Sequence, residues 1–236
     1  MIDIRPFAGL GHAAHGWLDA RHHFSFANYH DRARMGWGAI RVWNDDTIAA
    51  HTGFDPHPHR DMEIVTYVRS GAISHEDSLG HKGRTAAGDV QVMSAGTGII
   101  HAEYNREDTA TTLFQIWILP DRGGEPPAWG QREFPRGGKD DGARARRWVT
   151  LASGTPEDGA LPIRADARVL AATLRPGETL DLDLDPSRHQ YLVAPVGRIR
   201  VNGHDAQPRD GIAVTGETML TVEALEDAEL VLVDAR

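Results

Sequence analysis

Two short motifs contain residues that commonly bind metal ions, His57-Pro58-His59 and His101-Ala102-Glu103. Each motif places two potential ligands at positions i and i+2, and alternate residues of a β-strand face the same side. Two neighbouring strands could therefore direct three imidazoles and one carboxylate into one cavity. These nitrogen and oxygen donors favour Fe(II), Cu(II), Ni(II) or Zn(II) over Ca²⁺ and Mg²⁺, which prefer shells made only of oxygen. The joint occurrence of the two motifs predicts a metal site.

The carboxylate ligand has two candidates. Glu103 ranks first, and Glu63 ranks second because it stands four residues after His59 with the same strand parity. Glu63 could replace Glu103, or it could accept a hydrogen bond that fixes the tautomer of a metal-bound imidazole. Pro58 removes a backbone donor, so its motif is expected at a strand edge, a strand entry or a bulge. The alternative interpretation of residues 55–59 is a polar surface turn.

The histidines are concentrated in the first half of the chain, since eleven of the 13 lie between His12 and His101. We therefore expect the chemistry in that half. The histidines outside the two motifs show no regular ligand spacing and are interpreted as packed or exposed, namely His12, His15, His22, His23, His30, His51, His75 and His81. The sequence contains no Gly-x-Ser-x-Gly motif, phosphate-binding loop or dinucleotide fingerprint, so hydrolase, kinase and dehydrogenase functions have no motif to support them.

Composition narrows the class of protein. The 236 residues, 40% of them hydrophobic, suffice for one large β domain or two small ones. A net charge of −9 weighs against nucleic acid or an anionic membrane as the main partner. The absence of cysteine excludes disulfides, thiolate nucleophiles and iron–sulfur clusters. No long apolar run or signal-peptide pattern is present, so the expected location is the cytoplasm.

Short apolar runs separated by 25 glycines and 13 prolines predict mostly β-structure. The runs Ile64–Val68, Leu113–Leu119 and Leu230–Val233 alternate or are rich in β-branched residues. No stretch shows an apolar period of 3.6 over three turns, so we expect few and short helices. Asn202-Gly203 indicates a two-residue hairpin turn. An all-β sandwich or barrel is the predicted fold class.

The two halves of the chain show weak similarity, with Tyr67 and Tyr191 at corresponding positions. The same offset places Asp181 and Asp183 where the first half has His57 and His59, so the second half lacks a matching metal site. The aspartates are interpreted as the solvent-facing side of an alternating strand. We expect a first domain at residues 1–134 and a second domain at 148–236.

Residues 120–147 are rich in glycine, proline and charge, which is typical of a connecting segment, and residues 135–147 are predicted to be the linker itself. Its basic side chains could form a phosphate-binding patch, although a solvated connection is the favoured interpretation. The basic residues are Arg132, Arg136, Lys139, Arg144, Arg146 and Arg147.

Beyond the two motifs, longer stretches resemble the pirin family, especially bacterial pirin-like proteins assigned quercetin 2,3-dioxygenase activity. These stretches are His15–Asp19, Phe24–Tyr29, His57–Glu63, Met93–Ile99 and His101–Asn105. The resemblance is strong over residues 1 to about 134 and only general beyond them. One departure is Ala102, where many relatives carry serine. Ala102 flanks two ligand positions but is expected to point away from the cavity.

The resemblance implies a bicupin fold, which is two antiparallel jelly-roll β-barrels in tandem, with a single metal in the first. It implies His57, His59, His101 and Glu103 as ligands, usually for Fe(II), with Cu, Ni, Zn or Mn as alternatives. The wider cupin pattern would place its glutamate at Glu63, so both glutamates stay candidates. The duplication already supplies two barrels, which favours a monomer.

The leading functional hypothesis is a metal-dependent dioxygenase that cleaves a flavonol such as quercetin with O₂, with Glu103 as proton acceptor and Glu63 as the alternative. The rival hypothesis is a non-catalytic metal-containing redox sensor or regulatory protein with a protein partner. A roomy cavity lined by residues such as Phe54, Met62 or Trp43 would favour the enzyme. A third hypothesis, a cupin isomerase with a histidine base, has no dedicated motif.

Overall fold

The computed structural model describes residues 1–134, 144–156 and 159–236. Within these ranges the chain is almost entirely β-structure, with two short 3-10 helices, η1 (Phe7–Gly9) and η2 (Arg32–Arg34). None of the described helices has the length and apolar character needed to cross a membrane. The predicted all-β class and the shortage of helices are confirmed.

The first half of the chain forms two antiparallel sheets from eleven strands. These strands are β2 (Gly11–Ala14), β3 (Leu18–His22), β4 (Ile40–Ile48), β5 (Thr52–His59), β6 (Glu63–Ser70), β7 (Ala72–Asp77), β8 (Lys82–Ala86), β9 (Val90–Ser94), β10 (Ile99–Asn105), β11 (Thr111–Ile118) and β12 (Ala128–Arg132). One sheet has the order β12-β9-β6-β11-β4-β3-β2 and the other has the order β5-β10-β7-β8. The strand β5, which carries His57 and His59, lies at a sheet edge, as Pro58 predicted.

The second half repeats this plan and adds the first strand of the chain. Its strands are β1 (Ile2–Arg5), β13 (Val149–Ser153), β14 (Leu161–Pro162), β15 (Ala167–Leu174), β16 (Thr179–Asp183), β17 (His189–Val196), β18 (Ile199–Val201), β19 (His204–Ala206), β20 (Gly211–Thr215), β21 (Met219–Ala224) and β22 (Ala228–Ala235). They form sheets of order β1-β20-β17-β22-β15-β13-β14 and β16-β21-β18-β19. The predicted hairpin at Asn202-Gly203 connects β18 to β19, and both residues have positive φ.

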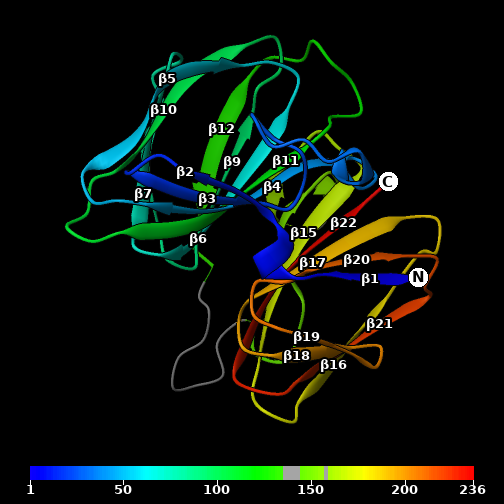
Figure 1. Cartoon of the computed structure of the whole chain (residues 1–236). Helices are drawn as coiled ribbons and strands as arrows, with labels where there is room; N and C mark the ends of the chain where they lie inside the picture. The colour runs from blue at the N-terminus through cyan, green and yellow to red at the C-terminus, as the bar shows by residue number, and fades with distance from the viewer. Residues whose placement is uncertain (135–143, 157–158) are drawn as a thin grey trace.

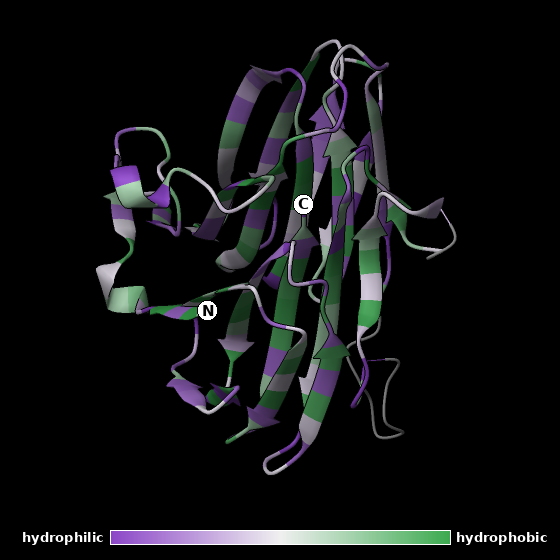
Figure 2. Cartoon of the chain, turned by 90° about the vertical axis from the view of Figure 1, so that its right-hand side faces the viewer, coloured by the Kyte–Doolittle hydropathy of each residue, from purple (hydrophilic) through white to green (hydrophobic). Residues whose placement is uncertain are grey.

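The two seven-stranded sheets pack against each other in the middle of the molecule (Figure 1). The largest buried cluster contains Trp43, Tyr67 and Phe114 from the first sheet and Tyr191 and Val231 from the second. Figure 2 shows the hydrophobic residues that recur along these central strands. The four-stranded sheets cover the outer faces, so each half is a sandwich and the halves share one core.

The interiors of the two sandwiches differ in polarity. On β6, Val65 and Tyr67 face the shared core, whereas Thr66 faces the interior of the first half and contacts Glu103 there. The interior of the second half is filled by apolar side chains such as Leu170, Leu192 and Leu232. Polar side chains inside a sandwich require partners, so the first half is the one built for a polar site.

The strand β16 confirms the interpretation of its aspartates. Asp181 and Asp183 are exposed, while Leu180 and Leu182 between and beside them are partly buried against the apolar interior. Neither aspartate belongs to a group of described residues that could hold a metal ion.

The connecting segment differs in part from its prediction. Residues 128–132 form β12, which pairs with β9, instead of a solvated connection. Arg144 is fully buried, with one guanidinium nitrogen 2.9 Å from Tyr67 Oη and another donating to the carbonyl groups of Gly88 and Phe134. A guanidinium can satisfy several buried acceptors at once, which makes Arg144 part of the contact between the halves. Arg136 and Lys139 lie outside the described residues.

Candidate metal centre

Three neighbouring strands of the four-stranded sheet carry the candidate ligands. The central strand β10 pairs with β5 on one side, where His101 lies opposite His57. It pairs with β7 on the other side, where Glu103 lies opposite His75. Residues directly opposite in a sheet face the same side, so all four point into the interior of the first half. A register shift between His101 and Glu103 marks a bulge at the site.

The histidines of the two motifs meet as the sequence predicted. The ring nitrogens of His57, His59 and His101 lie within 4.8 Å of one another, and their ring centroids are 4.4 to 5.0 Å apart. His57 Nδ1 is 2.7 Å from the carbonyl oxygen of Asp55. Because a carbonyl can only accept, Nδ1 carries the proton and Nε2 presents a lone pair.

Electrostatics keep the buried rings neutral. Burial lowers the pKa of His59 to about 4, with His57 contributing to the shift. Burial also lowers the pKa of His101 to about 2, helped by His57 and His59. Both rings are therefore uncharged at neutral pH, which is the state that binds metal. Both ring nitrogens of His101 are buried without a hydrogen-bond partner among the described residues. An orphaned imidazole of this kind fits a site that holds an ion.

Glu103 connects the two sheets of the first half. Its Oε1 accepts from Gln91 Nε2 at 2.5 Å and its Oε2 accepts from Gln115 Nε2 at 2.7 Å. Thr66 Oγ1 lies 3.5 Å from Oε1. Burial raises the pKa of Glu103 to about 7, although these donors favour the carboxylate. An oxygen of Glu103 lies within 4.8 Å of ring nitrogens of His75 and His101, so the glutamate adjoins the histidine group.

Glu63 occupies a different place from Glu103. The chain turns between β5 and β6, so parity counted from His59 does not carry over to Glu63. Glu63 has the strand parity of Val65 and Tyr67, which face the shared core, and its Oε2 accepts from Ser94 Oγ at 2.6 Å. Burial raises its pKa. Neither metal-type group of the described residues contains Glu63.

His75 is packed, in agreement with one of its two interpretations from the sequence, but its position beside His101 and Glu103 was not predicted. It is buried, and its ring stacks on Trp129 at a centroid distance of 4.9 Å. Its Nε2 is 3.0 Å from Asp77 Oδ2. The i, i+2 spacing of His75 and Asp77 was the available signal, because it repeats the spacing of the two motifs.

An open cavity of about 390 Å³ adjoins the histidines. Its walls include the aromatic side chains of Trp17, Phe26, Phe54 and Trp117. His57, His59 and Gln115 also line it, so the cavity reaches the candidate ligands and the partner of Glu103. A mostly aromatic wall with a few convergent polar groups is typical of a site for a small organic ligand.

The expected lining is confirmed only in part. Phe54 lines the cavity, whereas Met62 lines a neighbouring hollow of about 290 Å³ that shares Phe26 and Trp117. Trp43 is fully buried in the shared core and lines neither. Its strand position explains this, since Trp43 has the parity of the β4 face that packs on the second half.

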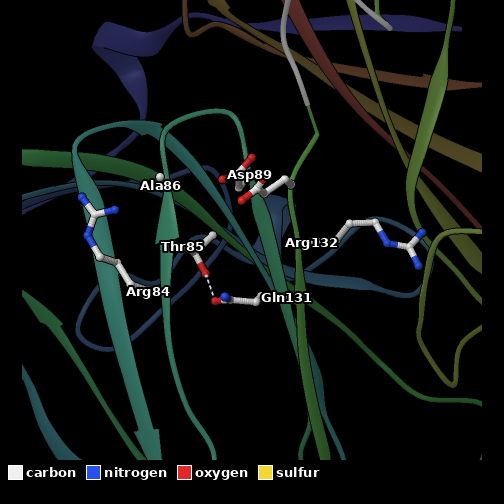
Figure 3. Close-up of a pocket in the computed structure, with 7 residues that line it drawn as sticks. Arg84, Thr85, Ala86, Asp89, Gln131 and Arg132 are labelled. Carbon is white, nitrogen blue, oxygen red and sulfur yellow. Dashed lines mark hydrogen bonds between the residues drawn. The ribbon is translucent and has the colours of Figure 1, made fainter.

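A separate hollow of about 320 Å³ lies at the C-terminal ends of β8 and β12 (Figure 3). Both of its arginines already have partners, because Arg84 pairs with Glu107 at 2.8 Å and Arg132 donates to the carbonyl of Gly159. Thr85 and Gln131 share a hydrogen bond of 3.2 Å within it.

Comparison with known proteins covers both halves. Residues 4–118 match the Pirin family model, and residues 150–235 match the model described as quercetinase C-terminal cupin domain. A pirin-like protein of Caulobacter vibrioides is 60% identical over 236 residues, with 100% of both chains covered. A quercetin 2,3-dioxygenase of Escherichia coli is 41% identical over 235 residues, covering 99% of this chain and 98% of that protein.

The fold agrees with these matches. The crystal structure of the bacterial pirin YhhW from Escherichia coli in complex with nickel(II) has a TM-score of 0.92 and 39% sequence identity. The alignment covers 100% of this chain and 99% of that chain. The expected bicupin architecture is confirmed, with each cupin built as a sandwich of jelly-roll sheets. The match to the Pirin family model and the identities of 41% and 60% over the full length show that the chain belongs to the pirin family.

Proposed function

We propose that this protein is a metal-dependent dioxygenase that cleaves a planar aromatic substrate of the flavonol type, such as quercetin, with O₂. The observation that supports this most is the cavity of about 390 Å³, which has aromatic walls and reaches His57 and His59. The relative named quercetin 2,3-dioxygenase, at 41% identity, supports the same substrate class. A roomy cavity beside the candidate ligands favours the enzyme over a non-catalytic sensor.

The residues that would hold the metal are His57, His59, His101 and Glu103. The neutral rings and the orphaned nitrogens of His101 fit a divalent ion, and the related YhhW structure contained nickel(II). We propose Fe(II) as the native ion, with Ni, Cu, Zn or Mn as alternatives that the same donors accept. When bound, the metal would act as a Lewis acid that lowers the pKa of a substrate hydroxyl.

The aromatic walls would orient the substrate. Trp17 and Phe54 contact each other edge to face, with ring centroids 5.0 Å apart. On the other wall, Trp117 contacts His59 with centroids 4.9 Å apart. Flat aromatic ligands pack well against such faces and edges. The two walls would hold the flat rings of the substrate between them, with one edge of the substrate next to the histidines. They would also exclude water from the reacting carbon atoms.

Glu103 is the proposed proton acceptor for the substrate hydroxyl. Gln115 lines the cavity and donates through Nε2 to Glu103 Oε2, so it holds the carboxylate toward the substrate side. Glu103 would take the proton on an oxygen that is not engaged by the metal, and in the metal-free protein burial raises the pKa of this carboxyl to about 7. Glu63, the alternative from the sequence, lies on β6 in the other sheet of the first half, where its Oε2 accepts from Ser94 Oγ at 2.6 Å.

The test measures O₂ uptake and carbon monoxide release with quercetin, using protein loaded anaerobically with Fe(II). Wild-type turnover that disappears in His101→Ala together with bound metal would support the proposal. His204→Ala, which changes an exposed histidine of the second half, is the matched control and should turn over normally. Full metal occupancy without turnover would overturn the proposed catalytic function. It would favour the rival function as a metal-containing sensor or interaction protein.

A further inference from the structure

A chain of buried polar groups extends from the metal centre toward the surface through β7. Asp77 Oδ2 lies 3.0 Å from His75 Nε2 and 2.9 Å from His81 Nδ1. The side chains of His75 and Asp77 are fully buried, whereas that of His81 is 40% exposed. None of these three residues has a role in the proposed reaction, although burying the side chains of His75 and Asp77 carries a cost in free energy.

The hydrogen bonds of Asp77 fix the tautomer of His75. Asp77 Oδ1 accepts from the backbone N–H groups of Leu79 and His81 at 2.9 and 3.0 Å. Two backbone N–H groups and two imidazole nitrogens thus surround the two oxygens of Asp77, which is the environment of a carboxylate. The group is therefore a carboxylate that only accepts, so His75 Nε2 must donate to it. A neutral His75 is then left with a lone pair on Nδ1.

Two neighbouring imidazoles, those of His75 and His101, have buried ring nitrogens without hydrogen-bond partners among the described residues. His75 Nδ1 is buried without a partner among the described residues, and both ring nitrogens of His101 are in the same state. The two rings are neighbours with centroids 5.3 Å apart. If His101 binds an ion through one nitrogen, its other nitrogen carries a proton that needs an acceptor. The lone pair of His75 is the complementary acceptor.

The surroundings hold His75 in this orientation. The Trp129 ring lies nearly parallel to the His75 ring, with an interplanar angle of 12°. Gly83 on the adjacent strand leaves room for this stack, because a Cβ there would be 2.2 Å from Trp129 Cη2. Asp77 on one edge and Trp129 on one face together restrict rotation of the ring.

We propose that His75 is a positioning residue whose Nδ1 accepts the N–H of His101, directly or through one water, and so directs the other nitrogen of His101 toward the metal. The proposal rests on the metal site described under the proposed function. His75 would then act through His101 without touching the substrate, and Asp77 would act through His75. This extends the usual pattern, in which a carboxylate or carbonyl orients a metal-bound histidine, by one additional imidazole.

The test is Ni(II) affinity, measured by competition with a chromophoric chelator. His75→Phe keeps the ring that stacks on Trp129 but removes the acceptor, and we expect it to weaken binding by roughly 10- to 100-fold. His75→Asn places an amide oxygen near the position of Nδ1 and should restore part of the affinity. His81→Phe is the matched control, since it removes the other imidazole from Asp77 but leaves His75 and His101 together.

Asp77→Asn provides an independent test in case the His75 variants fail to fold. The two backbone amides would keep the oxygen of the new carboxamide on their side, so its NH₂ group would face His75 Nε2. His75 would then accept through Nε2 and carry its proton on Nδ1, where it could not accept from His101. This nearly isosteric variant should fold, as circular dichroism can verify, and should lose Ni(II) affinity as His75→Phe does.

Electron paramagnetic resonance of the Cu(II)-loaded proteins separates positioning from ligation. We expect the same number of coordinated nitrogens in His75→Phe as in the wild type. Loss of one nitrogen would overturn the proposal, because His75 would then be a ligand. Unchanged Ni(II) affinity in His75→Phe and Asp77→Asn would also overturn it while leaving the metal site intact. Failure of the wild type to bind Ni(II) would instead refute the metal site on which both proposals depend.

Discussion

Gly53 controls how closely β5 approaches β10, and its replacement tests whether strand spacing sets the metal site. A Cβ at Gly53 would lie 2.2 Å from the backbone oxygen of Glu103 and 2.5 Å from Tyr104 Cα. Both contacts are backbone atoms, which cannot rotate away. Since ordinary contact begins at 3.4 Å, Gly53→Ala must separate the strands by about 1 Å. That movement would carry the histidines of β5 away from His101.

The expected cost follows from this displacement. Overpacking of this kind destabilises a protein by about 1 to 3 kcal/mol, which corresponds to a fall in Tm of about 2 to 12 °C for a chain of this size. Ligand distances must hold within about 0.2 Å, so Ni(II) affinity should fall at least tenfold, by an order-of-magnitude argument. Differential scanning calorimetry and chelator competition measure the two effects.

Gly9→Ala is the matched control for Gly53→Ala. A Cβ at Gly9 has nothing within 4 Å, and its backbone does not have positive φ. The same chemical change there should leave both Tm and Ni(II) affinity near their wild-type values. If Gly53→Ala also bound Ni(II) with wild-type affinity, the reasoning that β5 positions the ligands through close strand contact would be refuted.

Three further changes test other parts of the structure. Arg144→Met removes hydrogen bonds to Tyr67 and two carbonyl groups and should lower the free energy of unfolding by about 3 to 5 kcal/mol, as measured by urea denaturation. In metal-free protein, the raised pKa of Glu103, about 7 against an ordinary 4.5, adds stability below pH 4.5 that is lost as the pH rises through 7. Relative to Glu103→Gln, the wild type should therefore lose roughly 3 kcal/mol across that window in chemical denaturation. Trp17→Leu removes an aromatic edge contact and should raise KM for quercetin about 2- to 10-fold with little change in kcat.

Each of these has a result that would contradict it. Arg146→Met changes an exposed arginine, so an equal loss in Arg144→Met and Arg146→Met would show that burial of Arg144 contributes nothing. Parallel stability curves for wild type and Glu103→Gln between pH 4.5 and 7 would mean that Glu103 is not desolvated. A fall in kcat with unchanged KM in Trp17→Leu would place Trp17 in the chemical step instead of in binding.

The sequence predicted those features that depend on local pattern. Alternating and β-branched runs indicated the strands. Because proline lacks a backbone N–H to donate within a sheet, Pro58 predicted an edge position for the first motif, and β5 lies at an edge. The i, i+2 spacing predicted that His57, His59 and His101 lie together, because residues two positions apart on a strand face the same side. These arguments need only the two-residue period of a strand.

Other features depend on contacts between distant residues and could not be predicted in the same way. Glu63 stayed the second candidate after Glu103 because the turn after His59, which puts the two glutamates on different sheets, was not visible in the sequence pattern. Arg144 looked like a solvated charge because nothing local indicates that Tyr67, Gly88 and Phe134 surround it. His75 joins the site only through pairing of β7 with β10, which is a long-range choice.

The core shared by the two halves has a consequence for how the metal centre behaves on dilution. Trp43, Tyr67 and Phe114 would be exposed if the first half were cut from the chain, and such a face needs a permanent cover. The second half supplies that cover from the same polypeptide, in the place that a second subunit would take in a dimer of single sandwiches. Its effective concentration is therefore fixed by the covalent connection. The framework that supports the ligands should persist at any protein concentration, where a dimer would dissociate.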